Sequence, residues 1–270
     1  MSHLLVQLSD LHITAPGVLA YGWVDTAAHL RRAIDAVVHL PQLPVAITIT
    51  GDLTDNGRPE EYAHLRELLS PIDCPVYLLP GNHDERRGLR EAFADHSWMK
   101  ADDRDDFIQY AVDLGGLRLL ATDTAVSGAP HGALCERRLR RIAEQLDEAP
   151  NTPTVLALHH PPFRTLIEHM DQIGLLEGAP ALARIVARHP QVQRVICGHV
   201  HRSVQVQWAR TTALTAPSTA HQVHLDLDAR APLAFVMEPP GFLVHAWTED
   251  GTVVTHLVAI GQFDLFDDCE

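Results

Sequence analysis

The chain has 270 residues, 46% of them hydrophobic, which is enough for one large domain with a sizeable core. Its formal net charge of −14 disfavours nonspecific binding to a nucleic-acid backbone, so an anionic substrate would need a local source of attraction. No apolar run reaches about 18 residues, so no membrane span is expected. The first segment, MSHLLVQLSDLH, lacks the basic and apolar regions of a secretory signal, and we therefore expect a cytoplasmic protein.

The four cysteines, Cys74, Cys135, Cys197 and Cys269, are far apart in the sequence, and no Cys-x-x-Cys pair occurs. This spacing argues against a disulfide framework and against a cysteine zinc site. We expect buried, reduced thiols.

Short runs rich in β-branched residues alternate with segments of helical periodicity, which predicts an α/β domain with helices on the faces of a sheet. In chain order the predicted elements are strand Leu4–Leu8, helix Thr26–Leu40, strand Val45–Thr50, helix Pro59–Ser70, strands Val76–Leu79, Ile108–Asp113 and Leu117–Ala121, helix Glu136–Glu148, strand Thr154–Leu158, helix Ala181–Arg188 and strand Val192–Cys197.

The pattern changes beyond about residue 203, where no helical segment separates the apolar runs VQVQW, TTALTA, HQVHLDL, GFLVHAW and TVVTHLV. These runs are typical of strands in a meander, and we expect them to form a second sheet that packs on the first. The whole chain, residues 1–270, is predicted to be a single domain. Residues 164–180 are a candidate cap over a site, and residues 203–260 are expected to contribute to the second sheet or to a dimer contact.

Five predicted strands are each followed at once by Asp, Asn or His. In an α/β sheet, ligands bind beyond the carboxyl ends of the strands, so these polar residues meet if their strands are neighbours. Each residue alone is typical of a turn or a helix cap, and only their joint occurrence favours a site. The residues are Asp10, His12, Asp52, Asn82, His159, His199 and His201.

Two carboxylates, one amide and four imidazoles are more ligands than one tetrahedral zinc ion needs. The set suits two metal ions about 3.5–4 Å apart that share a carboxylate. Nitrogen and oxygen ligands without thiolate favour Mn, Fe, Zn or Co. Two such cations would also attract an anionic group despite the acidic chain.

The blocks SDLH (Ser9–His12), GDLTD (Gly51–Asp55), GNHD (Gly81–Asp84), HHPP (His159–Pro162) and GHVH (Gly198–His201) resemble those of the calcineurin-like metallophosphoesterases in wording, order and spacing. A narrower resemblance, to bacterial glycerophosphodiester phosphodiesterases and class III cyclic-nucleotide phosphodiesterases, is carried by YGWVD, GRPEEY and APSTAHQV.

The resemblance implies a four-layer αββα sandwich with a dimetal site at the carboxyl ends of the strands. It implies that Asp10, His12 and His201 hold one metal, that Asp52 bridges, and that Asn82, His159 and His199 complete the second. By the same resemblance His83 faces the substrate rather than a metal. His160 is then a supporting or structural residue, and Asp84 either supports the site from behind or caps the next helix.

The implied reaction is in-line attack on phosphorus by a hydroxide that bridges the two metals, with His83 as acid or charge stabiliser. His221 is a second candidate for substrate binding, and a core strand position is its equal alternative. For Arg86 and Arg87, a solvated helix start is favoured over a contact with substrate.

We expect small phosphodiesters as substrates, namely 3′,5′-cyclic nucleotides, glycerophosphodiesters or both. The alternatives are a phosphomonoesterase or protein phosphatase, a nuclease, and a non-catalytic scaffold. The acidic balance and the lack of an aromatic and basic groove argue against a polymeric nucleic acid. We also expect a homodimer or a larger homo-oligomer, with Ala231–Trp247 either as core strands, as a dimer contact or as a wall of the site.

Overall fold

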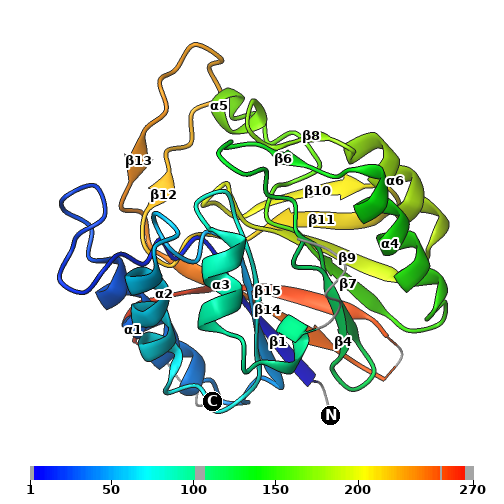
Figure 1. Ribbon diagram of the computed structural model, residues 1–270, viewed down its shortest axis with the longest axis horizontal. Helices are drawn as coiled ribbons and strands as arrows, with labels where there is room; N and C mark the ends of the chain where they lie inside the picture. Colours follow the sequence, from blue (N-terminus) through cyan, green and yellow to red (C-terminus); the bar gives the residue numbers. More distant parts are fainter. Residues whose placement is uncertain (1–2, 101–106, 250, 265–270) are drawn as a thin grey trace, which may run out of the picture.

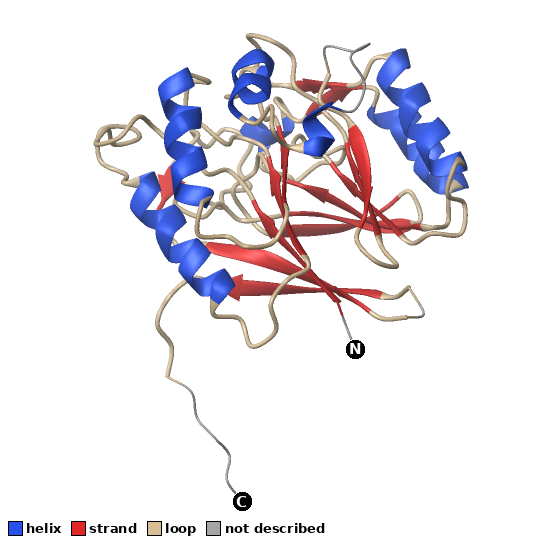
Figure 2. Cartoon of the chain, turned by 60° about the horizontal axis from the view of Figure 1, so that its bottom comes forward, coloured by secondary structure: helices blue, strands red, loops and turns tan. Residues whose placement is uncertain are grey.

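The computed structural model describes residues 3–100, 107–249 and 251–264, and they form two mixed β-sheets that pack face to face (Figures 1 and 2). The first sheet has five strands in the order β15–β14–β1–β2–β3, and the second has six in the order β10–β11–β9–β7–β5–β4. The first sheet comprises β1 (His3–Leu8), β2 (Ala46–Thr50), β3 (Val76–Leu79), β14 (Gly241–Trp247) and β15 (Val253–Ala259). The second comprises β4 (Tyr110–Asp113), β5 (Arg118–Ala121), β7 (Thr154–Ala157), β9 (Val192–Cys197), β10 (Val204–Trp208) and β11 (Thr211–Thr215).

Helices cover the outer face of each sheet. The core against the first sheet includes apolar residues of α1 (Thr26–Val38), α2 (Pro59–Leu69) and α3 (Arg86–Ala92). The core against the second sheet includes those of α4 (Glu136–Asp147) and α6 (Ala179–Arg188). None of the described helices is both long and apolar enough to cross a membrane. The short elements are a 3₁₀ turn (Ser97–Lys100), α5 (Glu168–Asp171), and the two-stranded pairs β6 (Gly132–Ala133) with β8 (Leu175–Glu177) and β12 (Gln222–Val223) with β13 (Phe235–Val236).

The first helix shows how local sequence builds these layers. Leu30, Ile34 and Val37 recur at helical spacing and are buried against the sheet. Asp25 precedes the helix, and its carboxylate accepts a hydrogen bond from the Ala28 backbone N–H at 2.8 Å. This cap satisfies one of the N–H groups that the first turn leaves without a partner.

The inner faces of the two sheets share one apolar core. Val6 and Ile49 of the first sheet belong to the same buried cluster as Val155 and Ile196 of the second. The order of layers is therefore helices, sheet, sheet, helices (Figure 2). The predicted four-layer αββα sandwich is confirmed, and every strand and helix predicted before residue 198 is found within two residues of its predicted bounds.

The prediction for the C-terminal part needs correction. The strands after residue 203 belong to both sheets and not to one. β10 and β11 lie in the second sheet, whereas β14 pairs with β1 of the first sheet and β15 pairs with β14. Only Gln222–Val223 of the run HQVHLDL is a strand. A regular strand pattern does not reveal which sheet it joins, because hydrogen-bond partners lie far away in sequence.

The expectation of buried thiols holds for Cys197 alone among the cysteines that the structure describes. Cys74 is half-buried and Cys135 is exposed. Cys269 lies outside the described residues.

Candidate metal centre

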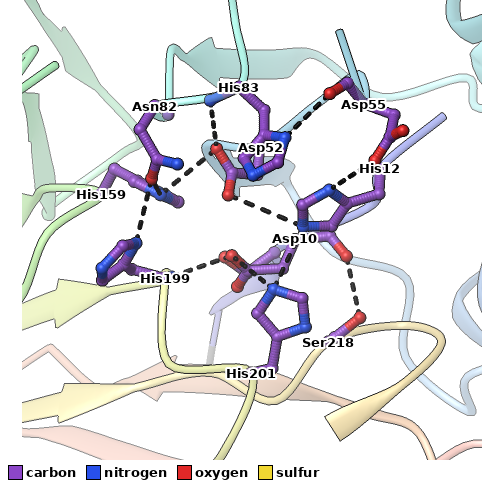
Figure 3. A network of polar contacts seen from close by, with 12 residues as sticks. Asp10, His12, Asp52, Asp55, Asn82, His83, His159, His199, His201 and Ser218 are labelled. Carbon is purple, nitrogen blue, oxygen red and sulfur yellow. Dashed lines mark hydrogen bonds and ion pairs between the residues drawn. The ribbon is translucent and has the colours of Figure 1, made fainter. Parts of the chain in front are cut away.

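The polar residues that follow five strands converge at one end of the interface between the sheets (Figure 3). The ends of β1, β2 and β3 belong to the first sheet and those of β7 and β9 to the second. The five strands therefore do not all lie in one sheet. Their ends come together because the two sheets pack face to face. All seven residues singled out in the sequence are brought together: Asp10, His12, Asp52, Asn82, His159, His199 and His201.

Five of these seven residues have a left-handed backbone conformation. This conformation costs a residue other than glycine roughly 1–2 kcal/mol, and such strain gathers at functional sites. The chain bends sharply just after β1, β2 and β9. The bends place Asp10 and His12 beyond the end of β1, and His199 and His201 beyond the end of β9. The φ angles are 53° at Asp10, 46° at His12, 48° at Asp52, 70° at His199 and 51° at His201.

Four buried side chains form the first cluster, with one potential ligand atom from each lying within 4.8 Å of the others. The shortest distance, 3.1 Å, separates the Nε2 atoms of His12 and His201. Asp52 Oδ2 lies 3.6 Å from His12 Nε2, and Asp10 Oδ1 lies 3.6 Å from His201 Nε2. Two imidazoles and two carboxylates therefore face a common point.

Hydrogen bonds at Nδ1 orient the imidazoles of His12 and His201. His12 Nδ1 lies 3.3 Å from the Asp55 carboxylate, and His201 Nδ1 lies 3.0 Å from the His221 carbonyl oxygen. A carbonyl or an ionised carboxylate only accepts, so Nδ1 of each ring carries a proton. The two Nε2 atoms therefore face each other among carboxylate oxygens, where a proton held by His12 or a metal cation satisfies them. Burial opposes protonation of His12, but the carboxylates outweigh it and raise the pKa of the ring. A metal cation would satisfy all four groups at once.

The second cluster surrounds the amide of Asn82. Its Oδ1 lies 3.1 Å from His159 Nε2 and 3.0 Å from His199 Nδ1. His159 Nδ1 donates to the Thr50 carbonyl oxygen at 2.7 Å, which directs Nε2 at the oxygens of Asn82 and Asp52. Without metal, a proton on Nε2 satisfies these oxygens, and a metal cation would take the place of that proton.

One carboxylate reaches both clusters. Asp52 Oδ2 is near His12, whereas Asp52 Oδ1 lies 3.4 Å from His159 Nε2 and accepts the His83 backbone N–H at 3.0 Å. A shared carboxylate of this kind is a feature of two-metal sites. Asp10 Oδ2 is buried without a hydrogen-bond partner, which leaves a further oxygen for a cation. The residues present therefore fit two metal ions.

Burial and mutual charge shift the acidity of these groups. Burial raises the pKa of Asp10 to about 6. Burial also opposes ionisation of Asp52, but the neighbouring His159 overrides it and holds the Asp52 pKa well below its usual range. The same carboxylate outweighs burial at His159 and raises its pKa to about 9, whereas burial lowers the pKa of His199 to about 3. Groups with acidities pushed apart in one buried site are typical of functional centres.

Two glycines of the motifs leave room for these side chains. A Cβ atom on Gly51 would lie 2.3 Å from His159 Nδ1, and one on Gly81 would lie 2.1 Å from Asp52 Oδ1. Any larger residue would push a ligand-type group out of place, so close approach explains both glycines.

The two histidines of HHPP differ in their contacts. His160 uses both ring nitrogens within the protein, Nδ1 with the Thr124 hydroxyl at 2.8 Å and Nε2 with the Pro130 carbonyl oxygen at 3.2 Å. His159 uses only Nδ1 in this way and directs Nε2 at Asn82. The geometry thus separates a ring available for coordination from a ring already satisfied.

His83 lies at the edge of the centre and borders a cavity of about 620 Å³. Its ring packs edge-on against that of His12, with centroids 4.6 Å apart, and its Nδ1 donates to the Asp55 carbonyl oxygen at 2.8 Å. The cavity is also lined by Asn82, Arg87 and Ser127. A group bound there would contact both His83 and the second cluster.

His221 is buried beside the first cluster, and neither ring nitrogen has a hydrogen-bond partner. Its ring centroid lies 4.7 Å from that of His201, and the rings of Tyr21 and Phe235 pack edge-on against it at 5.1 and 5.2 Å. Burial lowers the pKa of His221 to about 3, so the ring is neutral. A buried imidazole without partners beside a polar centre is available to a ligand.

Arg86 and Arg87 differ although they are adjacent. Arg86 forms a two-pronged ion pair with the buried Asp123, with distances of 2.6 and 2.9 Å. Arg87 is exposed and pairs with Glu91 one helical turn away. The solvated helix start expected for both describes only Arg87, because Arg86 ties the start of α3 to the loop after β5.

Asp84 does not cap the helix that follows it. The cap is Glu85, whose side chain accepts the Gly88 backbone N–H. Asp84 is half-buried and joins the GDLTD and GNHD loops. It accepts hydrogen bonds from the backbone N–H groups of Leu53, Thr54 and Gly81 and from the hydroxyls of Thr54 and Tyr62.

Sequence reasoning missed two supporting contacts. The Asp55 carboxylate orients His12, and the Ser218 hydroxyl donates to the Asp10 backbone carbonyl at 2.8 Å. Asp55 is the last residue of GDLTD, and Ser218 lies within APSTAHQV. Their membership of these motifs could have marked both as residues that support the site.

Comparisons with known proteins agree with this geometry. The family model described as calcineurin-like phosphoesterase matches residues 3–203. The chain is 38% identical over 261 residues to the "Probable glycerophosphodiester phosphodiesterase GpdQ" of Arcobacter nitrofigilis, which covers 97% of this chain and 94% of that protein. It is 30% identical over 260 residues to the 3′,5′-cyclic adenosine monophosphate phosphodiesterase CpdA of Escherichia coli, with coverage of 94% and 88%.

Among solved structures, a dimetal phosphatase from Danio rerio aligns with a TM-score of 0.65 at 15% identity, over 96% of this chain and 99% of that chain. This likeness concerns the fold. The family model spans well over half of the chain, and the narrower resemblance seen in the sequence is confirmed by the curated relatives. The chain is therefore an enzyme of the calcineurin-like phosphoesterase family.

Proposed function

We propose that this enzyme hydrolyses small phosphodiesters, namely 3′,5′-cyclic nucleotides, glycerophosphodiesters or both, at a centre that holds two metal ions. The observation that carries the proposal is the pair of clusters whose nitrogen and oxygen atoms converge on two points and share Asp52. The names of the curated relatives favour diesters over monoesters.

The ligand assignment follows the two clusters. Asp10, His12 and His201 would hold the first ion, and Asn82, His159 and His199 the second, with Asp52 common to both. We assign His159 rather than His160 because only His159 has a nitrogen left for a metal. Nitrogen and oxygen donors without thiolate suit Fe, Mn, Zn or Co.

When bound, two such ions would lower the pKa of a water molecule and neutralise charge on a phosphoryl group. The chain's own contribution at the leaving group is His83. Its Nδ1 is occupied by the Asp55 carbonyl, so Nε2 is the atom that would donate a proton to the departing ester oxygen. The cavity of about 620 Å³ beside His83 is of the size of small-ligand sites and suits a small ester group.

We also assign His221 to substrate binding. Its unpartnered ring nitrogens lie beside the first cluster and would hydrogen-bond an ester or phosphoryl oxygen. The exposed Tyr21 and Phe235 would then form an aromatic border to the bound ester group.

A substrate panel tests the proposal. After loading with Mn²⁺, the enzyme is assayed with cAMP, a 2′,3′-cyclic nucleotide, glycerophosphoethanolamine, bis(p-nitrophenyl) phosphate and p-nitrophenyl phosphate. Diesters should show the higher kcat/KM. A clear preference for the monoester would overturn the diester assignment, and no turnover with Mn, Fe, Zn or Co would favour a scaffold.

Residues 164–180 are proposed as a cap in this single-domain enzyme. Ile167 and Met170 pack against Val200, which lies between His199 and His201, so movement of the segment would reach the first cluster. A variant that replaces Ile167 with Ala should raise KM more than it lowers kcat.

Homodimerisation is proposed through the C-terminal hairpin between β12 and β13. This hairpin and its flanks expose large apolar side chains, as expected at a contact between copies. Light scattering should return at least about 60 kDa, twice the 29.8 kDa of one chain. The exposed residues are Leu225, Leu227, Leu233, Phe235 and Met237.

A further inference from the structure

Gln7 lies three residues before Asp10 and connects the two sheets beneath the metal centre. The side chain is fully buried. Its Nε2 donates to the Thr50 hydroxyl at 3.0 Å and to the Cys197 carbonyl oxygen at 2.9 Å, and its Oε1 lies 3.1 Å from His245 Nε2. One carboxamide thus reaches β2 and β14 of its own sheet and the end of β9 in the facing sheet.

The direction of every hydrogen bond in this group follows from one acceptor. The Cys197 carbonyl can only accept, so the NH₂ end of Gln7 must face it and the oxygen must face His245. His245 Nε2 therefore carries the proton. Its Nδ1, 2.9 Å from Thr255 Oγ1, then accepts from that hydroxyl. The network has one consistent arrangement of hydrogens.

His245 is itself a buried neutral ring. Its side chain has no exposed surface, and burial, aided by the charge of Arg194, lowers its pKa to about 3. Burying an imidazole in a sheet is costly unless both nitrogens are satisfied, as they are here by Gln7 and Thr255. His245 in turn fixes the orientation of the Gln7 amide.

The network continues to the centre through Thr50 and Ser9. The Thr50 hydroxyl, held by Gln7, donates to Ser9 Oγ at 2.8 Å, and the Thr50 carbonyl accepts from His159 Nδ1 at 2.7 Å. Ser9 packs so tightly on Gly198 that a Cβ atom there would lie 2.1 Å from its hydroxyl. This group therefore includes Ser9, next to Asp10, and Thr50, two residues before Asp52. It contacts His159 directly and also contacts Gly198, the residue before His199.

We propose that Gln7, locked by His245, is a positioning residue that sets the spacing between the metal ligands of the two sheets. Asp10 and Asp52 belong to the first sheet, whereas His159, His199 and His201 belong to the second. The Gln7 contact with Cys197 holds these sets together directly below the centre. The proposal rests on the assignment of the two clusters as a dimetal site.

The test compares Gln7→Met, which keeps side-chain length and removes the hydrogen bonds, with Thr50→Val, which cuts the hydroxyl link but keeps the carbonyl for His159. Thr48→Val is the matched control. Thr48 is paired with Gln7 in the sheet register, is fully buried, and its hydroxyl makes no hydrogen bond. Each purified full-length protein is stripped of metal and titrated with Mn²⁺ by calorimetry.

We expect Mn²⁺ affinity to fall about 10–100-fold in Gln7→Met and Thr50→Val, as for other residues that orient ligands, and to stay unchanged in Thr48→Val. A purely structural role predicts instead a lower Tm in Gln7→Met with wild-type Mn²⁺ affinity. Wild-type affinity in both test variants overturns the proposal. Thr50→Val leaves the Gln7 contacts with Cys197 and His245 intact, so if Gln7→Met does not fold, His245→Phe, which removes the group that orients the Gln7 amide, is titrated in the same way and decides.

A metal-free measurement separates this inference from the proposed function. In histidine-ring NMR spectra without metal, the hydrogen-bonded Nδ1–H proton of His159 should be present in the wild type and weakened or shifted in Gln7→Met. If wild-type protein bound no metal, the dimetal assignment would fail, while this signal would still report whether Gln7 positions His159. An unchanged signal would count against the positioning role.

Discussion

His83 donates its Nδ1–H to the backbone carbonyl of Asp55 at 2.8 Å, which leaves Nε2 as its free nitrogen. Its backbone N–H at the same time donates to Asp52, the carboxylate that both clusters share. The residue is thus fixed to the centre by its backbone while its ring nitrogen stays available. A histidine held in this way can exchange a proton at Nε2 without losing its anchor.

Replacing His83 with alanine should leave both metal equivalents in place and lower kcat. The loss should be about 10²–10⁴-fold, the range for general-acid assistance. Elemental analysis and steady-state kinetics on the same preparation would measure both quantities. Asn82→Ala is the contrasting variant, because it should weaken one metal site only. Loss of a metal equivalent in His83→Ala would instead identify His83 as a ligand.

Replacing Asp55 with alanine should weaken binding of one metal ion, because the carboxylate fixes the tautomer of His12 from 3.3 Å away. We expect affinity to fall about 10–100-fold. Asp55→Asn keeps an oxygen that can accept from His12 Nδ1 and should retain most of the affinity. Equal losses in the two variants would show that charge, rather than orientation, is what Asp55 supplies.

Replacing Arg86 with alanine should destabilise the fold much more than replacing its neighbour Arg87. Arg86→Ala leaves the buried Asp123 without its cation, and breaking such a pair costs about 3–5 kcal/mol. Arg87→Ala removes an exposed pair with Glu91 that water and salt screen, and it should leave the stability almost unchanged. Urea unfolding would measure both. A stable Arg86→Ala variant with a raised KM would mean that Arg86 acts on substrate.

The seven candidate ligands could be found in the sequence because each lies within four residues of the end of a strand. Asp10 follows β1 and His199 follows β9, so local patterns were enough to find them. The four layers were implied by the family resemblance of the same motifs. What local patterns could not supply is which sheet each C-terminal strand joins.

The pairing of Gln7 with His245 illustrates this limit. The two side chains are 238 residues apart in sequence and meet only because β14 runs beside β1. Similarly, a sequence shows Arg86 and Arg87 as equivalent, although only Arg86 reaches the buried Asp123. Contacts between distant elements depend on packing of the complete fold, which residue spacing does not encode.

The stability of the metal-free protein should fall as pH is lowered, and His245 should account for part of that fall. Its folded pKa, about 3, is below its unfolded value of 6.5, so the unfolded chain binds the extra proton. The contribution is complete above pH 6.5 and is lost from there toward pH 3, which amounts to about 2 kcal/mol between pH 7 and pH 5. Urea unfolding with EDTA present measures this. Between pH 7 and pH 5, the free energy of unfolding of His245→Phe should fall by about 2 kcal/mol less than that of the wild type. His39→Gln, which removes an exposed histidine, is the control and should show the pH dependence of the wild type. Identical pH dependence in wild type and His245→Phe would show that His245 is not held neutral by the fold.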